Sequence, residues 1–338
     1  MNKRLLNIII YLFFVLFIQA QDIHLTQYYT SPLNLNPAVS GFFYGTQRFT
    51  MQNKSQWRSV TVPFKTFSAS VDMPVIKRLL KQDMFGVGLV VNRDIAGDSK
   101  FSTTQVNLSF SYIKSISRIN NQFVGAGIQL GAAQRSIDYS QLIFDSQFDG
   151  NAYNPALGNN EHFAKTNFLF YDISAGVFWN LLKHRKQGFD AGIAMYHINR
   201  PKQSLFYDNS IKLDRKIVIH AGSQFRAKKN IDIFPGILFM NQGKYREIDI
   251  GALAKIIKVP NEANYFALAL GMYYRINDAF NFIAGIDYRD VSVGVSYDVN
   301  TSTLVPASNY MGGFEVSIIY IINKYKKTYV KKIPCPIF

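Results

Sequence analysis

The last third of the chain alternates apolar residues with small or polar ones in three consecutive stretches. These stretches cover residues 279–289, 290–299 and 312–322. Successive side chains of a β-strand point to opposite faces of the sheet, so each stretch predicts a strand with one apolar face and one small or polar face. A sheet packed on a water-soluble core would alternate in the same way. The class of protein therefore depends on how often the pattern recurs and on what precedes it.

The N-terminus has the pattern of a secretory signal sequence. Lys3 and Arg4 precede a mainly apolar run over residues 5–18, and Ala20 follows. This order predicts cleavage between Ala20 and Gln21 and removal of residues 1–20 as a signal peptide. The alternative is an uncleaved membrane anchor, but the run is short for a spanning helix and no stop-transfer pattern follows it. We therefore expect an exported mature chain.

The composition of the rest of the chain favours a membrane barrel. No later stretch approaches the roughly 18 apolar residues that a spanning helix needs. Yet the chain is 48% hydrophobic and 15% aromatic, and only 17% of its residues are charged. Low charge, many aromatic residues and short alternating strands are typical of outer-membrane barrels. A soluble exported β-sandwich is the competing interpretation, but no linker rich in Pro, Ser or Gly divides the chain after residue 45.

About fourteen strand-like segments follow the first 45 residues, and an even number suits such a barrel. We predict an all-β fold, a transmembrane antiparallel β-barrel over residues 46–322 that passes many times through the cell outer membrane. The strand at 312–322 should pair with the strand near Thr46 and so remove the sheet edges. The predicted segments are 46–56, 64–73, 84–92, 100–112, 122–134, 166–179, 188–197, 214–225, 231–240, 245–257, 264–275, 279–289, 290–299 and 312–322.

The lengths of the connections predict which way the barrel faces. The longest connections lie near residues 135–165, 198–213 and 300–311. If both chain ends are periplasmic, strand parity places all three on the outer side. Long external loops and short periplasmic turns are what outer-membrane barrels show.

Residues 21–45 lack any regular alternation. Tyr28, Tyr29, Pro32 and Pro37 make this N-terminal irregular segment aromatic and rich in turn formers. Three placements remain open on the sequence: against the periplasmic mouth, inside the lumen as a plug, or loose as a leader.

Positive charge gathers on the connections that parity assigns to the periplasm. The formal net charge is +15, but an exported chain has little access to nucleic acid, so we expect no nucleic-acid partner. We hypothesise that these connections and a basic periplasmic tail, residues 323–338, dock an acidic partner or the anionic inner leaflet. The alternative is that the charges only keep the turns solvated. The candidate docking residues are Lys77, Arg78, Lys81, Lys183, Arg185, Lys186, Lys228, Lys229, Lys326, Lys327, Lys331 and Lys332.

Charged residues on the small or polar strand faces predict a polar lumen. They could line a pathway for a small molecule. A structural hydrogen-bonded network is the favoured interpretation, because buried charges are normally paired. The candidate lumen residues are Asp72, Glu247, Asp249, Asp287, Asp298 and Glu315, together with Arg289.

No motif predicts catalysis, a cofactor or a metal site. The glycine pairs at residues 86–88 and 125–127 do not complete a phosphate-binding loop, so closely packed strand positions are expected there. The five histidines lack metal-ligand spacing and are expected at polar surfaces or in loops. No nucleophile elbow is present. Cys335 is the only cysteine, which excludes a disulfide framework and leaves either an unpaired tail thiol or a bond to a partner.

Six different short motifs are spread in order along nearly the whole mature chain. They are Gln27-Tyr28-Tyr29 with Pro32 and Asn36-Pro37-Ala38, Gln56-Trp57-Arg58 with Pro63-Phe64-Lys65-Thr66, Ser70-Val71-Asp72-Met73-Pro74, Val295-Ser296-Tyr297-Asp298-Val299-Asn300, Gly312-Gly313-Phe314-Glu315-Val316-Ser317, and Ile333-Pro334-Cys335-Pro336. Together they resemble the PorP/SprF family of outer-membrane proteins associated with type IX secretion. Ile337 and Phe338 depart from that family, which usually has a basic or polar residue beside the closing Cys-Pro pair.

The resemblance implies a lipid-embedded β-barrel that works without catalysis or cofactors. It implies a role in the secretion or surface attachment of cargo with a C-terminal secretion domain, including gliding adhesins. The expected partners are that cargo and periplasmic or outer-membrane components of the secretion machinery. The alternative is a passive or substrate-specific channel for small molecules.

Overall fold

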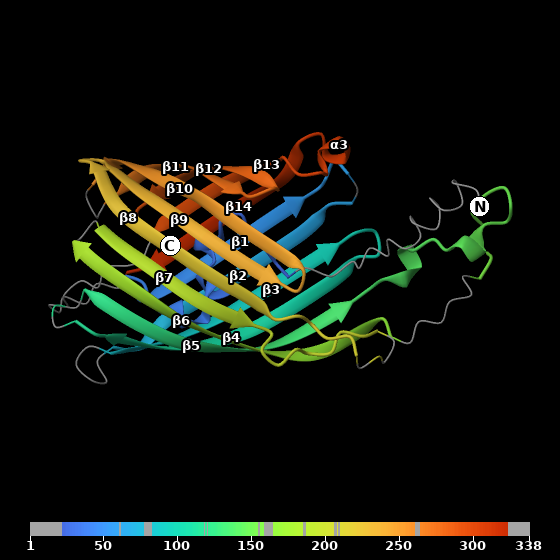
Figure 1. Cartoon of the computed structure of the whole chain (residues 1–338), viewed down its shortest axis with the longest axis horizontal. Helices are drawn as coiled ribbons and strands as arrows, with labels where there is room; N and C mark the ends of the chain where they lie inside the picture. Colours follow the sequence, from blue (N-terminus) through green and yellow to red (C-terminus); the bar gives the residue numbers. More distant parts are fainter. Residues whose placement is uncertain are drawn as a thin grey trace, which may run out of the picture.

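The computed structural model describes residues 22–60, 62–77, 83–117, 119, 121–154, 156–158, 165–184, 187–205, 208, 210–260 and 264–323. Fourteen antiparallel strands form a closed barrel (Figure 1). In chain order they are β1 (Gln47–Gln56), β2 (Phe64–Lys77), β3 (Met84–Ala96), β4 (Phe101–Ser115), β5 (Gln122–Ser136), β6 (Asn167–His184), β7 (Gln187–Tyr196), β8 (Lys216–Lys228), β9 (Ile231–Gln242), β10 (Tyr245–Val259), β11 (Phe266–Arg275), β12 (Ala279–Tyr288), β13 (Val291–Asn300) and β14 (Met311–Ile322).

The predicted barrel and its strand count are confirmed. Each strand pairs with its neighbours in sequence, and β1 pairs with β14 to close the sheet, as in the register Met51↔Ile318. The main differences are at strand ends. β2 and β6 continue to Lys77 and His184, beyond the predicted ends at residues 73 and 179. No helix among the described residues is long and apolar enough to cross a membrane.

The alternating pattern sorts the side chains between the outer and inner faces. On β12, Phe282 and Ile286 are about half exposed on the outer face, whereas Ile283 and Asp287 are buried inside. At the closing seam, the Phe49 and Tyr320 rings stack on the outer face with centroids 6.3 Å apart. The outer wall is thus an apolar surface suited to lipid, and the closed sheet has no free edge.

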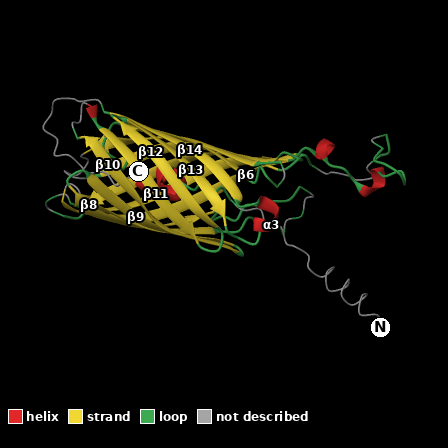
Figure 2. Ribbon diagram, turned by 90° about the horizontal axis from the view of Figure 1, so that it is seen from above, coloured by secondary structure: helices red, strands yellow, loops and turns green. Residues whose placement is uncertain are grey.

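The two ends of the barrel carry connections of different length. All three long connections, residues 137–166, 197–215 and 301–310, lie at one end, which we call the loop end. The short helix α3 (Val305–Ser308) and the 3-10 helices η3 (Tyr139–Gln141) and η4 (Asp145–Gln147) belong to these connections. The longest connection, between β5 and β6, reaches far beyond the barrel (Figure 2). The opposite end, called the turn end, has connections such as residues 229–230 and 289–290.

Residues 22–45 lie inside the barrel, and we call them the plug. They form η1 (Tyr28–Thr30), α2 (Pro32–Leu35) and η2 (Pro37–Val39), drawn in blue within the strands of Figure 1. Leu33, Ala38 and Phe42 are completely buried. Of the three placements that the sequence left open, the structure has the plug in the lumen.

Proline and asparagine give the plug its short, turning path. Pro32 and Pro37 each begin a helix, where the missing N–H removes no intrahelical hydrogen bond. The Asn36 side chain accepts a hydrogen bond from the Ala38 N–H at 3.0 Å and caps η2. The chain therefore turns repeatedly as it runs from the loop end, at Asp22, to the turn end, where β1 begins.

Candidate functional site

Glycines on the inner barrel face make room for the plug. A Cβ at Gly86 would lie 1.9 Å from the Ser40 carbonyl oxygen, and one at Gly127 would lie 2.6 Å from the Ala38 Cα. No larger residue could allow the plug backbone so close to these strands. The interpretation of the glycine pairs as closely packed strand positions, rather than phosphate loops, is therefore confirmed. A Cβ would also come too close to plug atoms at Gly88, Gly176, Gly192, Gly236 and Gly294.

The turn-end half of the plug, residues 33–43, is held mainly by apolar packing. The Phe42 ring centroid lies 4.8 Å from that of Phe178 and 5.4 Å from that of Phe123. Ring pairs at this spacing add a modest attraction to the burial itself. The buried cluster consists of Ala38, Val39, Phe42, Met84, Ile113, Phe123, Phe178 and Leu182.

One buried ion pair supports this packing. The Asp72 carboxylate accepts two hydrogen bonds from Arg48, from Nε at 2.9 Å and from Nη2 at 2.7 Å. Its Oδ2 also accepts the backbone N–H of Gly41 at 2.7 Å. The Arg48 guanidinium lies 4.7 Å from the Phe43 ring centroid. Asp72 thus ties β1, β2 and the plug together.

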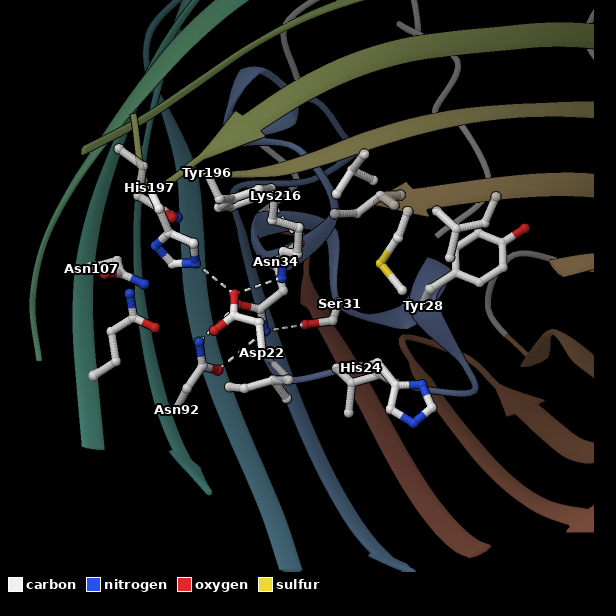
Figure 3. Close-up of a pocket in the computed structure, with 18 residues that line it drawn as sticks. Asp22, His24, Tyr28, Ser31, Asn34, Asn92, Asn107, Tyr196, His197 and Lys216 are labelled. Atoms are coloured by element: carbon white, nitrogen blue, oxygen red, sulfur yellow. Dashed lines mark hydrogen bonds and ion pairs between the residues drawn. The ribbon is translucent and has the colours of Figure 1, made fainter. Parts of the chain in front are cut away.

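The loop-end half of the plug, residues 22–27, is held mainly by charge. The Asp22 carboxylate lies 2.9 Å from His197 Nε2 and 2.9 Å from Lys216 Nζ (Figure 3). The other ring nitrogen of His197 lies 3.0 Å from Asp172 Oδ1. The backbone N–H of Asp22 donates to Gln242 at 3.0 Å. The first described residue of the plug is therefore fixed by partners from several strands.

These contacts shift the ionisation of both groups. Burial would lower the pKa of His197, but Asp22 and Asp172 outweigh it and raise that pKa to about 9. Burial would raise the pKa of Asp22, but Lys216 and His197 outweigh it and hold that pKa well below its ordinary value. The pair is therefore charged on both sides near neutral pH.

Two lumen carboxylates form hydrogen bonds with the next plug residues. Glu315 accepts the backbone N–H of Thr26 at 2.7 Å and that of Gln27 at 3.0 Å. The Thr26 hydroxyl donates to Asp298 at 2.9 Å. Backbone N–H groups in this buried place need acceptors, so the carboxylates satisfy the plug backbone and position it at the same time.

A cluster around Arg275 continues this network. Its guanidinium lies 3.3 Å from Glu247, 3.3 Å from Asp249 and 3.5 Å from Asp298. His24 of the plug lies 3.2 Å from Glu247. Since charges buried in this way are stable only when paired, the cluster is consistent with a structural network.

All six candidate lumen acids lie on the inner face and are buried. Five belong to the contacts above, and the sixth, Asp287, pairs with Lys255 at 2.8 Å. Arg289 is the exception to the prediction: it is exposed in the turn between β12 and β13 and donates to Asn264. A two-residue turn leaves the lumen-facing alternation, so its side chain is free to point to solvent.

The cations and histidines of the lumen were not among the residues predicted to lie there. Arg48 and Lys54, on the inner face of β1, are 1% exposed, and both could have been found from the polar alternation of that strand. The expectation of surface or loop histidines is wrong for His220, which is buried with Nε2 3.3 Å from the Asn36 amide nitrogen. His197 lies in a connection as expected but is buried. In the described parts of the chain no group of His, Cys, Asp and Glu is arranged to hold a metal ion.

The candidate docking residues are only partly within the described residues. Lys183, Lys228 and Lys229 are exposed at the turn end, and Lys77 closes β2 at the same end. Arg226, a further basic residue near this end, pairs with Asp232. The remaining candidates and Cys335 lie outside the described residues: Arg78, Lys81, Arg185, Lys186, Lys326, Lys327, Lys331 and Lys332.

Above the plug, the loop end contains a large cavity, which we call the vestibule. Its volume is about 930 Å³, whereas three smaller cavities beside the plug hold about 40 to 50 Å³ each. Asp22 and His24 contribute to its floor, and Trp57, Phe64 and Phe101 to its wall. The barrel thus has a hollow at the loop end and a filled lumen beneath it.

Comparison with known families decides which barrel this is. The model of the type IX secretion system membrane protein PorP/SprF family matches residues 18–320, nearly the whole chain. The chain belongs to the PorP/SprF family. The motifs that suggested this family include plug contacts: Gln27, Asp72, Asp298 and Glu315 all bind between the plug and the wall.

A solved structure shows the same kind of fold at low identity. The toluene transporter TbuX of Ralstonia pickettii matches with a TM-score of 0.50 and 9% identity, over 86% of this chain and 92% of that one. The CymD monoaromatic hydrocarbon channel matches with a TM-score of 0.49 and 10% identity, over 88% of this chain and 94% of that one. A search of curated proteins finds no match.

The family and the barrel fold place this PorP/SprF protein in the outer membrane. Signal-peptide cleavage stays a prediction, since residues 1–21 lie outside the described residues.

Proposed function

We propose that this PorP/SprF barrel supports the export or surface anchoring of a cargo protein, such as a gliding adhesin with a C-terminal secretion domain, without catalysing a reaction. In this proposal the loop end meets the cargo outside the cell, and the turn end docks periplasmic machinery. The observation that carries it is the filled lumen beneath an open vestibule. A barrel closed in this way offers two separate binding ends rather than a passage.

The loop end has features that suit a protein partner. The connection over residues 137–166 exposes large apolar side chains, including Ile143 at 71% and Phe148 at 56%. Exposed apolar groups on an outer loop favour protein contacts over solvation. The long reach of this connection beyond the barrel (Figure 2) would bring these groups to a partner outside the membrane.

The turn end has features that suit an acidic partner. Lys183, Lys228, Lys229 and Lys258 are exposed there, and Asp290 is the exposed acid among the described residues of that end. The other acids of this end are occupied: Asp232 pairs with Arg226, and Asp83 accepts the Tyr112 hydroxyl at 2.5 Å. An unbalanced basic surface attracts and orients an acidic partner.

Purification of the tagged protein from detergent-solubilised outer membrane tests the docking. A Lys183→Glu, Lys228→Glu, Lys229→Glu variant should lose its periplasmic companions by at least about ten-fold, a change of about 1.4 kcal/mol. The matched control places the same three charge changes at the loop end, at Lys100, Lys202 and Lys212, and should keep those companions. If the turn-end variant recovers as much of the periplasmic companions as the wild type does, the docking role is wrong.

A deletion strain tests the cargo role. Loss of one surface protein, restored by the wild-type gene, is the expected result. If every surface protein is retained and uptake of a small solute is lost instead, the alternative of a small-molecule channel replaces the secretion role.

A further inference from the structure

The vestibule wall carries a row of four cross-strand neighbours from β2 to β5. Thr66 pairs with Asp94, Asp94 with Thr103, and Thr103 with Arg135. All four line the vestibule. Cross-strand partners on one face lie close enough to act on the same bound molecule. The row therefore presents a carboxylate and a guanidinium to one cavity.

Arg135 is held in place before any ligand arrives. Its guanidinium lies 5.4 Å from the Phe101 ring centroid and 5.9 Å from that of Phe170, and its Nε donates to the Thr103 hydroxyl at 3.1 Å. The residue is only 9% exposed. Stacked rings and one fixed hydrogen bond leave a planar fork with little freedom to lose on binding.

Arg135 also differs from the other buried arginines of the lumen. Arg48 and Arg275 lie within 4 Å of carboxylates, whereas no carboxylate of the described residues lies within 4 Å of Arg135. A buried cation is normally paired. Asp94 is separated from Arg135 in the row by Thr103, and it accepts a hydrogen bond from the Thr66 hydroxyl at 2.5 Å.

The rest of the vestibule wall is aromatic and apolar near this row. Trp57 and Phe64 meet edge to face with centroids 4.9 Å apart, and Phe101 joins them in lining the cavity. A volume of about 930 Å³ lies within the usual range of ligand pockets, roughly 300–1,000 Å³. Arg246 and Arg275 also line the cavity, but Arg275 is paired with carboxylates. Beside the row, the cavity thus combines the guanidinium of Arg135 with a surface for a ring or an aliphatic group.

We propose that the vestibule binds a ligand with a single carboxylate next to an aromatic or apolar group. Arg135 binds the carboxylate, and the wall formed by Trp57, Phe64 and Phe101 receives the apolar group. Asp94, two positions from Arg135 in the row, disfavours a second negative charge. This site goes beyond the secretion role, and two sources supply its chemistry: a free aromatic acid or the carboxyl end of a polypeptide.

The fluorescence of Trp57 offers a direct readout. The chain has two tryptophans, and Trp179 lies on the outer face at 37% exposure, so a Trp179→Phe background leaves Trp57 as the reporter. The probe is N-acetyl-phenylalanine, added to the full-length protein in detergent. The acid should give a saturable change, and its uncharged amide should bind at least about ten-fold more weakly, as expected for a lost charge-assisted hydrogen bond.

Variants test whether binding of the acid depends on the residues of the row, Arg135 and Asp94. Arg135→Gln should weaken binding of the acid by at least about ten-fold, and Arg135→Lys should recover part of the loss. Asp94→Asn should strengthen it, because a repelling carboxylate is removed. Arg93→Gln, which changes an exposed arginine of β3 outside the cavity, should change nothing. Heat-dependent gel mobility reports whether each variant folds.

Equal binding of acid and amide to the wild type would overturn the site, and so would unchanged binding of the acid to folded Arg135→Gln. If Arg135→Gln does not fold, two measurements still test the site: the comparison of acid with amide binding to the wild type, and the binding of the acid to Asp94→Asn. The peptide acetyl-Ala-Ala-Ala-Phe separates the sources: tighter binding than N-acetyl-phenylalanine identifies a polypeptide end, and equal binding identifies a free acid.

Discussion

The two halves of the plug are held by different forces. Residues 33–43, towards the turn end, pack apolar groups into the lumen against glycines and aromatic rings. Residues 22–27, towards the loop end, are bound by carboxylates, one lysine and one histidine. Apolar packing does not depend on pH, whereas ion pairs do. We therefore expect the turn-end half, where packing dominates, to stay in place as the pH changes, and the attachment of the loop-end half to change with solution conditions.

The largest expected effect comes from the apolar half. Phe42→Ala removes a fully buried ring from the turn-end cluster, and the free energy of unfolding should fall by about 3–5 kcal/mol. Thermal unfolding in detergent measures it. The matched control, Phe280→Ala, truncates a ring that is 37% exposed on the outer face of β12 and should cost much less. Equal losses would mean that the turn-end half of the plug does not contribute through packing.

Overpacking the same half should have the next largest effect. At Gly127 a side chain would meet the Ala38 backbone, so Gly127→Val should destabilise the plugged state by about 1–3 kcal/mol. Ala126→Val, on the same strand but on the exposed outer face, serves as the control and should be close to neutral. A Gly127→Val protein as stable as Ala126→Val would contradict the close approach of plug and wall.

The smallest effect is a pH-dependent loosening of the charged half. Folding raises the pKa of His197, so its contribution to stability is complete below its ordinary value of 6.5 and is lost as the pH rises through about 9. Asp22 has a lowered pKa, so its own contribution is present above its ordinary value of 3.8 and is lost only in strong acid. Between these limits the attachment of Asp22 to His197 should be intact.

Thiol labelling measures this loosening. In a Cys335→Ser background, Ile23→Cys should be labelled faster above pH 9 than at pH 7, relative to Ser140→Cys on an exposed connection. Val39→Cys, in the buried apolar half, should stay protected at both pH values. The ion-pair account fails if Ile23→Cys shows no extra labelling, or if His197→Asn leaves the pH dependence unchanged.

The wall of the barrel could be predicted from the sequence because its information is local. Alternation along β2, β10 and β12 to β14 fixes which side chains face inward, and this placed all six candidate acids on the lumen side. Arg289 was misassigned because the alternation stops at the two-residue turn. The errors in strand length fall at strand ends, as in β2, β3 and β6, which continue past the predicted ends.

The plug could not be placed because its contacts are remote and aperiodic. Thr26 binds Glu315, 289 residues away, and Asp22 binds His197, 175 residues away. No local sequence periodicity identifies either partner as a residue that binds the plug. The buried histidines were misjudged for the same reason: a lone His197 or His220 looks like a polar loop or surface residue until the plug is beside it. The glycines of β3 and β5 were the available signal, since small residues on an inner face imply that something approaches closely.

Electrical conductance in planar bilayers tests the central claim, the closed lumen, most directly. The wild-type protein, with residues 22–45 in the barrel, should give no large steady conductance at neutral pH. The Gly127→Val protein, in which the plug is displaced from the wall, should show conducting events. A large, steady conductance from the wild type would contradict the plugged barrel and favour a channel.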